Sequence, residues 1–327
     1  MIEVIATGGL ATIQDLGRRG ALKWGVGTSG AMDDLAVAAG NILLGNPDDA
    51  AVIEIQIFPF RIRFQEDTTF AVTGADCDAR LDDLAILPWC AHDARAGQVL
   101  QPGLPRRDGW AASRAYLCLA GGVDVPSVLG SRSTQLRGEF GGFEGRALRT
   151  GDKIATGPFR AASARVGLNP PALAMPLMVD GLPAVRVLRA AEYEAYTPQA
   201  QASLWSEPWR ISPQSDRYGF RLEGTPLMPK APLELRSHGI VPGVIQVPHG
   251  GQPIVQMRDA QPSGGYPKIG TVIEADLWRL GQTPIGGRVR FVEVTWDDAV
   301  AAQDANERWL AEARRLVGLF RARRGGQ

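Results

Sequence analysis

The sequence predicts a mainly β protein of two domains, with a few short helices and one long helix near its C-terminal end. Its 327 residues are 45% hydrophobic, which is enough to bury two cores of ordinary size. Glycine and proline, with 39 and 23 residues, are more frequent than in average proteins. Short apolar runs recur between Gly, Pro and Asp residues, and each run has the length of a strand.

Six runs in the first half are predicted to be strands, because they are apolar and end at turn residues. They cover residues 51–58, 61–64, 68–73, 84–87, 98–101 and 114–119. One helix is predicted among them, over residues 33–44. Asp33 is a suitable N-cap, Gly45 occupies the position where helices commonly turn left-handed, and Pro47 prevents continuation.

The second half continues the pattern of short strands. A short helix is predicted over residues 197–204, and strands are predicted over residues 185–188, 209–213, 217–222, 243–247, 253–257, 270–273 and 288–294. From Asp297 onward, apolar residues recur at spacings of three and four, which predicts a helix of about 25 residues. Arginines in its last turns suit the negative end of the helix dipole, and a docking surface is the alternative.

A domain boundary is predicted in the segment 159–183, which has adjacent prolines at 170 and 171, many small residues and few charges. The prediction is an N-terminal β-rich domain over residues 1–165, a linker over 166–183, and a C-terminal β domain with the terminal helix over 184–327.

Composition excludes several classes of protein. The 35 basic residues balance the 35 acidic ones, so no net field draws the chain to nucleic acid or to an anionic membrane. Three cysteines without a CxxC pair favour neither a disulfide framework nor a zinc site, and no metal is expected. The N-terminus lacks the features of a secretory signal, and no apolar run reaches the roughly 18 residues of a membrane span. We expect a cytoplasmic protein.

The common catalytic signatures GxxxxGK[ST], HExxH and GxSxG are absent, so any ATP is bound without a Walker motif or through a partner. Three glycine-rich segments remain as candidate sites. The first, residues 25–33, directly precedes the predicted helix. The free amides of a helix start attract anions, so a carboxylate or phosphate can dock here, with Ser29 and Asp33 as substrate-binding residues. A tight turn from strand to helix is the alternative.

The second segment, residues 121–145, holds Arg132 between two serines and close to Thr134. Guanidinium and hydroxyl donors at this spacing suit recognition of a planar carboxylate or a phosphate. Arg132, Ser133 and Thr134 are therefore candidate binding residues. The alternative is that the arginines brace a long loop through backbone carbonyls. A long irregular segment inside a compact domain is usually functional or an interface.

The third segment, residues 237–270, alternates polar residues with glycines and strand-forming residues, so several side chains can converge on one sheet face. Lys268 is one of only four lysines in the chain and follows a GGYP turn. A lysine beside an aspartate such as Asp259 can bind an anionic substrate or, when desolvated, transfer a proton. A solvated surface lysine is the alternative, and for His249 a plain turn residue is the favoured interpretation.

These segments contain motifs that occur together in one known family. The motifs are TIQDLGRRG at 12–20, SGAMD at 29–33, GNP at 45–47, LGSRST at 129–134, GGFEGRALRTGD at 141–152, SDRYGFRLEG at 215–224, PGVIQVPHGGQPIVQMRD at 242–259 and GGYPKIGTVIEADL at 264–277. The chain resembles the allophanate hydrolase subunit 2 family, also called biotin-dependent carboxyltransferases, over nearly its whole length. That family includes the C-type subunit of bacterial ATP-dependent 5-oxoprolinase, the antagonist of a sporulation-kinase inhibitor, and half of the carboxyltransferase domain of urea carboxylase.

The resemblance implies two cyclophilin-like β-barrel domains and an obligate partner. This partner is a subunit 1-like protein, which is the B-type subunit of 5-oxoprolinase. It is often joined by a LamB/YcsF-like protein, which is the A-type subunit. Because no biotin-carrier motif is present, the chain looks most like the oxoprolinase subunit. That likeness implies hydrolysis of 5-oxo-L-proline to L-glutamate, with ATP bound through the complex.

Two other functions within the family stay open. One is a carboxyltransferase half that works with biotin on urea or a related amide, and the other is a regulatory protein that binds a kinase-inhibitor-like partner. The chain also departs from the family pattern, because Pro262 and Ser263 stand where members commonly have two threonines. Pro262 removes one hydroxyl and one backbone donor, so substrate preference can differ.

We hypothesise from the resemblance that amide activation occurs at a subunit interface. One wall would consist of the three binding residues of the second segment, which would hold the negative substrate or phosphate. The second wall would consist of Gln246, Tyr266 and Lys268, with Asp259 orienting Lys268, and Lys268 and Asp259 are predicted to be catalytic. Donors of this kind stabilise a developing oxyanion, commonly by about 3 kcal/mol each.

Overall fold

The computed structural model of the protein describes residues 1–106, 112–158 and 166–325. The chain forms two compact units. Unit 1 contains Met1–Arg18, Ser29–Ala174 and Glu307–Gln327, and unit 2 contains Arg19–Thr28 and Met175–Asn306. The change from unit 1 to unit 2 after Ala174 lies inside the predicted linker over residues 166–183.

Neither unit is one continuous stretch, which differs from the predicted domains. Residues 19–28 belong to unit 2, where the Thr28 hydroxyl donates to the carbonyl of Arg258 at 3.2 Å. The last part of the C-terminal helix belongs to unit 1, because Ala313 and Val317 are buried in a hydrophobic cluster of that unit. The packing of apolar faces, rather than order along the chain, therefore decides which unit a segment joins.

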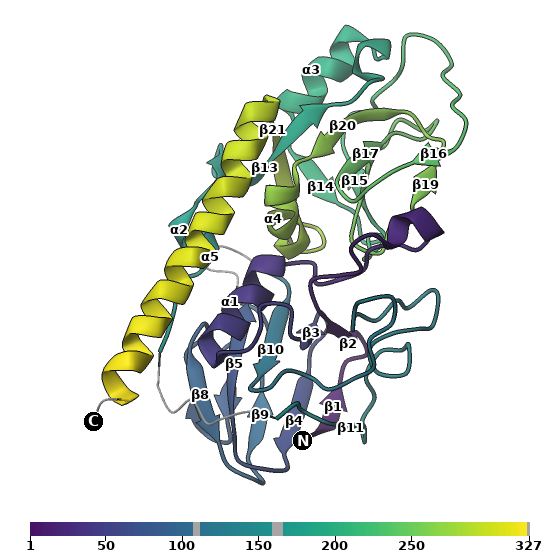
Figure 1. The fold of residues 1–327 in the computed structure, drawn as a ribbon. Coiled ribbons are helices and arrows are strands. Elements are labelled where there is room, and N and C mark those ends of the chain that lie inside the picture. Colours follow the sequence, from purple (N-terminus) through teal and green to yellow (C-terminus); the bar gives the residue numbers. More distant parts are fainter. Residues whose placement is uncertain (107–111, 159–165, 326–327) are drawn as a thin grey trace. The chain divides into compact units, whose positions relative to one another are not determined.

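Unit 1 contains two antiparallel sheets (Figure 1). In spatial order, the first consists of β11 (Lys153–Ile154), β1 (Ile2–Thr7), β4 (Phe60–Phe64), β9 (Val99–Gln101), β6 (Arg80–Leu81) and β7 (Leu84–Ala85). The second consists of β2 (Ala11–Gln14), β3 (Val52–Ile55), β10 (Ala115–Leu119), β5 (Thr68–Gly74) and β8 (Ala91–Ala94). Each of the six runs predicted in this half contains a strand. The other five strands, of two to six residues each, are additional to the prediction.

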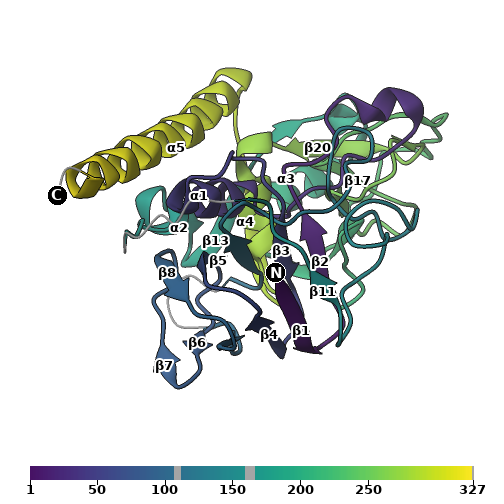
Figure 2. The same cartoon turned by 60° about the horizontal axis from the view of Figure 1, so that its bottom comes forward.

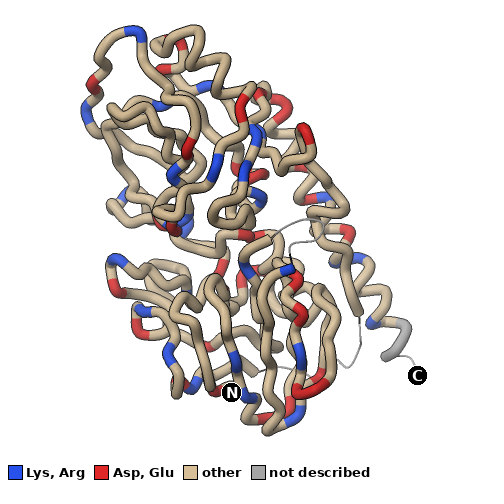
Figure 3. The backbone as a smooth tube through the Cα atoms, turned by 180° about the vertical axis from the view of Figure 1, so that it is seen from behind, with Lys and Arg blue, Asp and Glu red and all other residues tan. Residues whose placement is uncertain are grey.

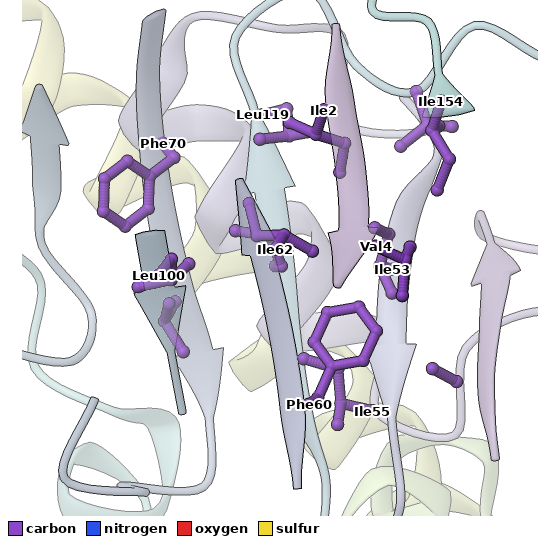
Figure 4. Packing of buried hydrophobic residues seen from close by; sticks show 14 of the residues in the cluster. Ile2, Val4, Ile53, Ile55, Phe60, Ile62, Phe70, Leu100, Leu119 and Ile154 are labelled. Atoms are coloured by element: carbon purple, nitrogen blue, oxygen red, sulfur yellow. The ribbon is translucent and has the colours of Figure 1, made fainter. Parts of the chain in front are cut away.

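The inner side chains of both sheets form one hydrophobic cluster, part of which is drawn in Figure 4. Along β4, Phe60, Ile62 and Phe64 are buried, whereas Arg61 and Arg63 between them are exposed. Such alternation is what a strand with one solvated face requires. The first sheet therefore covers the core on one side and faces solvent on the other at this strand.

Strands β5 and β10 are buried on both faces, which explains why their sequences are nearly continuous apolar runs. Val72 and Leu117 point into the cluster between the sheets. Ala71 and Cys118 belong to a second cluster that includes the buried face of α1 (Asp34–Leu44). The sheet with β5 and β10 is therefore the middle layer of unit 1.

Helix α1 begins and ends as predicted. The Asp33 carboxylate accepts a hydrogen bond from the amide of Ala36 at 2.9 Å, so Asp33 is the N-cap. Gly45 follows the last turn with φ of 74°, a left-handed conformation that suits glycine. The helix thus starts and stops on local signals that the sequence already contains.

Unit 2 is built on a closed barrel, which includes the strands labelled β13, β17 and β20 in Figure 2. Its strands are, in order, β13 (Leu182–Arg189), β20 (Lys268–Val272), β17 (Val244–Gln246), β18 (Ile254–Gln256), β15 (Gly219–Glu223), β14 (Trp209–Ile211) and β21 (Arg288–Glu293). Strand β21 pairs in parallel with β13 and closes the barrel of seven strands. All other neighbours in it are antiparallel, and β12 (Met178–Val179) pairs with β13 outside the ring. The predicted mainly β class is confirmed, and of the two predicted barrels the described residues contain one closed barrel, in unit 2.

The remaining short elements belong to unit 2, except α2, which ends the long segment of unit 1. They are the helices α2 (Pro171–Ala174, at the end of the unit 1 segment), α3 (Pro198–Ser206) and α4 (Leu277–Gln282), the 3-10 turns η1 (Ala21–Trp24), η2 (Tyr193–Ala195) and η3 (Glu274–Asp276), and the two-stranded sheet of β16 (His238–Gly239) with β19 (Ser263–Gly264). The predicted helix over residues 197–204 corresponds to α3, whose N-cap is Thr197.

The long terminal helix is α5 (Trp296–Gly325), with 30 residues. It opens with a reciprocal cap, in which the Asp298 amide donates to the Thr295 hydroxyl at 3.2 Å and the Thr295 amide donates to the Asp298 carboxylate at 2.9 Å. Two arginines of its later turns have partners in unit 1, because Arg314 pairs with Asp48 and Arg321 donates to the carbonyl of Leu43. These side chains therefore help to hold α5 against unit 1.

Charges of both signs are mixed along the whole backbone, as Figure 3 shows and as the balanced composition requires. No helix in the described part of the chain combines the length and the apolarity needed to span a membrane.

Candidate functional site

Lys268 lies in unit 2 at the start of β20, next to a carboxylate from a distant part of the chain. Its Nζ atom lies 3.1 Å from Oε2 of Glu192, and its backbone amide donates to the same oxygen at 3.1 Å. The two side chains are 14% and 18% exposed, so the ion pair is largely withdrawn from water but still accessible. Lys268 is therefore a positioned cation and not a freely moving surface lysine.

A second neighbour of Lys268 is His238 in β16. Pairing of β16 with β19 places His238 opposite Gly264, four residues before Lys268. Nζ of Lys268 makes a short contact with Nε2 of His238, and Nδ1 of the same ring lies 2.8 Å from the carbonyl oxygen of Arg236. Glu192, Lys268 and His238 thus form a row that we call the Lys268 cluster.

A β-bulge sets the direction of Lys268. Gln246 pairs with Lys268 whereas Ile245 pairs with Gly270, so Ile269 is the extra residue on β20. A bulge rotates the strand locally and re-aims the side chains beside it. The bulge therefore lets Lys268 leave the regular alternation of the barrel wall.

Gln246 is a buried residue that contacts the turn before Lys268. It is 2% exposed, its side-chain oxygen accepts a hydrogen bond from Gln256 at 3.1 Å, and its amide donates to the carbonyl of Tyr266 at 3.5 Å. A buried amide with both ends engaged positions its neighbours. In this structure, Gln246 therefore holds the GGYPK turn in place, and its predicted role in substrate binding stays a prediction.

The two glycines of the GGYPK turn are needed for close packing. A Cβ atom on Gly264 would lie 2.6 Å from Nε2 of Gln246, and one on Gly265 would lie 2.9 Å from the carbonyl oxygen of Leu235. Neither distance is possible without movement of the neighbours. The turn before Lys268 can therefore pack this closely only because both positions are glycines, and hydrogen bonds hold it there.

Beside the turn lies a cavity of about 240 Å³. Its wall includes Tyr266, which is 46% exposed, and His249, whose ring meets the Tyr266 ring edge-on with centroids 6.4 Å apart. Leu233, Leu235 and Pro267 supply apolar surface. The volume suits a small molecule, and an aromatic ring with a hydroxyl at the opening provides both apolar contact and one polar group.

Asp259 does not orient Lys268, so that prediction is wrong. Asp259 is 1% exposed and forms a two-pronged ion pair with Arg217, with Nε to Oδ2 at 2.9 Å and Nη2 to Oδ1 at 3.1 Å. A carboxylate whose two oxygens both accept from one guanidinium is already neutralised. Glu192 is the acid that pairs with Lys268.

In unit 1, the loop that carries Arg132 is organised around Asp15. Oδ1 of Asp15 accepts hydrogen bonds from the hydroxyls of Ser131 at 2.6 Å and Ser133 at 2.5 Å, and from the amide of Gly17 at 2.8 Å. Oδ2 accepts from the backbone amide of Arg132 at 2.5 Å. Asp15 is 6% exposed, so this carboxylate is a buried anchor of the loop.

The three predicted binding residues of this loop have different roles in the structure. The Ser133 hydroxyl is engaged by Asp15, and the Thr134 hydroxyl donates to the carbonyl of Ile13 at 3.0 Å. Both residues are buried, so both brace the loop. Arg132 is exposed, and its Nε donates to the carbonyl of Val125 at 3.1 Å. Of the three, only Arg132 presents its side chain to solvent, and substrate binding by it stays a prediction.

The start of α1 is closed by protein carboxylates. Asp33 caps the helix, and Glu54 accepts from the amide of Met32 at 2.8 Å and from the Tyr116 hydroxyl at 2.9 Å. In this structure Asp33 therefore has a structural role as the helix cap, and its predicted substrate contact stays a prediction. Ser29 is 1% exposed with φ of 50°, and its hydroxyl has no hydrogen-bond partner among the described residues.

The predicted site residues thus form two groups, each described within its own unit. Lys268, Tyr266 and Gln246 gather around one turn of unit 2, and Arg132 belongs to a loop of unit 1. Sequence analysis missed Glu192 and His238, which complete the Lys268 cluster. Nothing in the sequence around Glu192 marks it, because its partner lies 76 positions away.

Comparisons with known proteins agree with this architecture. The family model described as carboxyltransferase domain, subdomain A and B, matches residues 24–293. A Haemophilus influenzae protein, named as the C-type subunit of 5-oxoprolinase, is 40% identical over 317 residues, which cover 97% of this chain and 99% of that protein. An Escherichia coli protein of the same name is 39% identical, with 95% of this chain and 97% of that protein covered.

A solved structure is also similar. The crystal structure of the Kluyveromyces lactis urea amidolyase superimposes with a TM-score of 0.87 at 26% identity. The match covers 95% of this chain but 20% of that one. The chain therefore corresponds to nearly the whole of the two bacterial proteins and to one fifth of the yeast protein.

Proposed function

The chain belongs to the carboxyltransferase domain family, subdomains A and B, and on that premise we propose that it is the C-type subunit of a 5-oxoprolinase. The observation that carries the proposal is the identity of 40% with a bacterial protein of that name along 99% of that protein's length. A relative matched from end to end shares domain content as well as fold.

The proposed reaction is hydrolysis of 5-oxo-L-proline to L-glutamate, coupled to conversion of ATP into ADP and phosphate. Water adds to the lactam carbonyl carbon, the ring C–N bond breaks, and the ring nitrogen becomes the amino group of glutamate. The substrate is an anion with a carbonyl that gains negative charge during attack. The Lys268 ammonium, held by Glu192 at 3.1 Å, can bind the carboxylate or stabilise that developing charge.

We propose that this chain is active only with partners. The B-type and A-type proteins of 5-oxoprolinase, which the family resemblance implies, would complete the site and supply ATP binding, since no nucleotide-binding loop of the Walker type is present here. The proposed location of this complex is the cytoplasm.

The test is capture of the tagged chain from its own cells, with identification of the captured proteins and assay of glutamate release from 5-oxoproline and ATP. Co-capture of both partner types with ATP-dependent glutamate release is the expected result. In that complex, Lys268→Ala is expected to lower kcat about 100-fold or more. Lys230→Ala is the matched control, because Lys230 is an exposed lysine whose Nζ donates only to the carbonyl of Glu194.

A second candidate function is the carboxyltransferase half of a biotin-dependent urea or amide carboxylase. The observation that favours it is the structural likeness to the Kluyveromyces lactis urea amidolyase, with a TM-score of 0.87. It predicts capture of a biotinylated carrier and activity that avidin abolishes. Glutamate release that is insensitive to avidin would reject it.

A further inference from the structure

The hydrogen bonds of His238 determine which of its ring nitrogens carries the proton. Nδ1 lies 2.8 Å from the carbonyl oxygen of Arg236, and a carbonyl oxygen can only accept. Nδ1 must therefore carry a hydrogen. In the neutral ring, Nε2 then has a lone pair, and this nitrogen is the one that contacts Nζ of Lys268.

The ammonium group of Lys268 supplies the donor that the acceptor Nε2 of His238 requires. An ammonium group has three N–H donors and no acceptor. One donor is directed to Oε2 of Glu192 and a second to Nε2 of His238, so a third is left for a ligand. Two fixed directions determine the third, because the three N–H bonds are arranged tetrahedrally about the nitrogen.

We propose that neutral His238, with its proton on Nδ1, is a positioning residue that aims the Lys268 ammonium at the substrate. This role rests on the function proposed above. Protonation of Nε2 would turn the acceptor into a donor that faces three other donors, and would place two positive charges in contact. A ring with protons on both nitrogens would offer Lys268 no acceptor, so the direction of the ammonium depends on the neutral ring.

Other ionisable groups lie near the Lys268 cluster, and their effects on activity must be distinguished from the effect of His238. Glu192 faces Lys268 from the turn before η2, and Glu234, His249 and Tyr266 line the adjacent cavity. The variant His238→Gln distinguishes the effect of His238 from the effects of these groups. Its side-chain oxygen can accept from Lys268 at nearly the position of Nε2 but does not titrate, whereas His238→Ala removes the acceptor.

The first test uses the chain alone and needs no activity. Long-range ¹⁵N–¹H NMR of the three histidines at pH 8 is expected to show His238 with its proton on Nδ1. His92 is the internal control and is expected to show the opposite tautomer, because its Nε2 lies 2.8 Å from the carbonyl of Leu87. Loss of signals in His238→Gln and His92→Gln assigns each ring. A proton on Nε2 of His238 at pH 8 would overturn the proposal.

The second test measures kcat in the assembled complex. His238→Ala is expected to lower kcat about tenfold or more at pH 8, the loss expected for one hydrogen bond to a charged group. His238→Gln is expected to restore most of that loss, because its side-chain oxygen is again an acceptor for Lys268. His92→Gln is expected to behave as wild type.

The outcomes separate the two proposals. Equal kcat in wild type and His238→Ala, or no recovery of kcat in His238→Gln relative to His238→Ala, would overturn the positioning role while leaving the 5-oxoprolinase proposal intact. A wild-type complex that binds its partners but releases no glutamate would overturn the proposed function, and with it the role of His238 in that reaction.

Discussion

Arg217 and Asp259 form a buried ion pair in unit 2, joined by two hydrogen bonds of 2.9 and 3.1 Å although 42 residues separate them in sequence. The two side chains are 4% and 1% exposed. At this depth neither charge is solvated, so each depends on the other. The pair shows that both oxygens of the Asp259 carboxylate are engaged by Arg217, and the predicted catalytic role of Asp259 stays a prediction.

Asp259→Ala is therefore expected to lower the free energy of unfolding by about 3–5 kcal/mol, because it removes a carboxylate that makes two hydrogen bonds to a buried guanidinium. Urea unfolding of the chain measures the change. The control is Glu312→Ala in α5, which breaks an exposed pair with Arg315 and should leave stability nearly unchanged, because solvent screens such a pair. If Asp259→Asn abolished turnover but left stability unchanged, Asp259 would be catalytic after all.

Asp15 is expected to control the order of the loop that carries Arg132. Asp15→Ala removes the acceptor for two buried hydroxyls and two backbone amides, so it should cost at least about 2 kcal/mol of unfolding free energy. Arg132→Ala should leave stability nearly unchanged, since that side chain is exposed. Comparison of the two in urea unfolding, together with KM in the complex, separates loop order from substrate binding. Equal stability of both variants would contradict this account.

Two helical glycines should respond to alanine in opposite directions. In α1, a Cβ atom on Gly40 would lie 2.3 Å from Sγ of Cys118, so Gly40→Ala should destabilise by about 1–3 kcal/mol through overpacking. In α5, nothing lies within 4 Å of the same position on Gly318, so Gly318→Ala should stabilise by up to about 1 kcal/mol through helix propensity. Thermal unfolding measures both, and a stabilising Gly40→Ala would show that α1 can move away from β10.

Two buried thiols should make stability fall at alkaline pH. Burial raises the pKa of Cys118 to about 12, and burial together with the nearby Asp76 and Asp78 raises the pKa of Cys77 to about 12. Above an unfolded pKa near 8.5, the unfolded chain binds fewer protons than the folded one, so stability is full below that pH and declines as the pH rises towards 12. Each thiol contributes up to about 1.4 kcal/mol per pH unit in that window.

The measurement is urea unfolding between pH 8 and pH 10.5, compared with the variant Cys77→Ala and Cys118→Ala combined. The variant should show a smaller decline with pH than wild type. Cys90, which is half-buried and whose pKa burial raises less, is expected to react first with iodoacetamide in the native chain. If iodoacetamide labelled Cys118 before Cys90, the result would contradict the burial of Cys118.

Much of the fold follows from local sequence signals. Strands occur in all the predicted apolar runs, and α1, α3 and α5 occur where capping residues and periodicity place them. The extra strands β6, β16 and β19 have two residues each, which is too short for any alternation to be read. Their existence depends on a neighbouring strand that is distant in sequence.

The sequence by itself determined the mainly β class and the helix ends, because turn residues, caps and apolar spacing act over a few positions. Only the tertiary structure decided that Glu192 and His238 flank Lys268. It also decided that Arg217 forms an ion pair with Asp259, and that the end of α5 belongs to unit 1. These pairings are set by barrel closure, strand register and a bulge, which bring together residues 30, 42 and 76 positions apart. No local pattern encodes such distances.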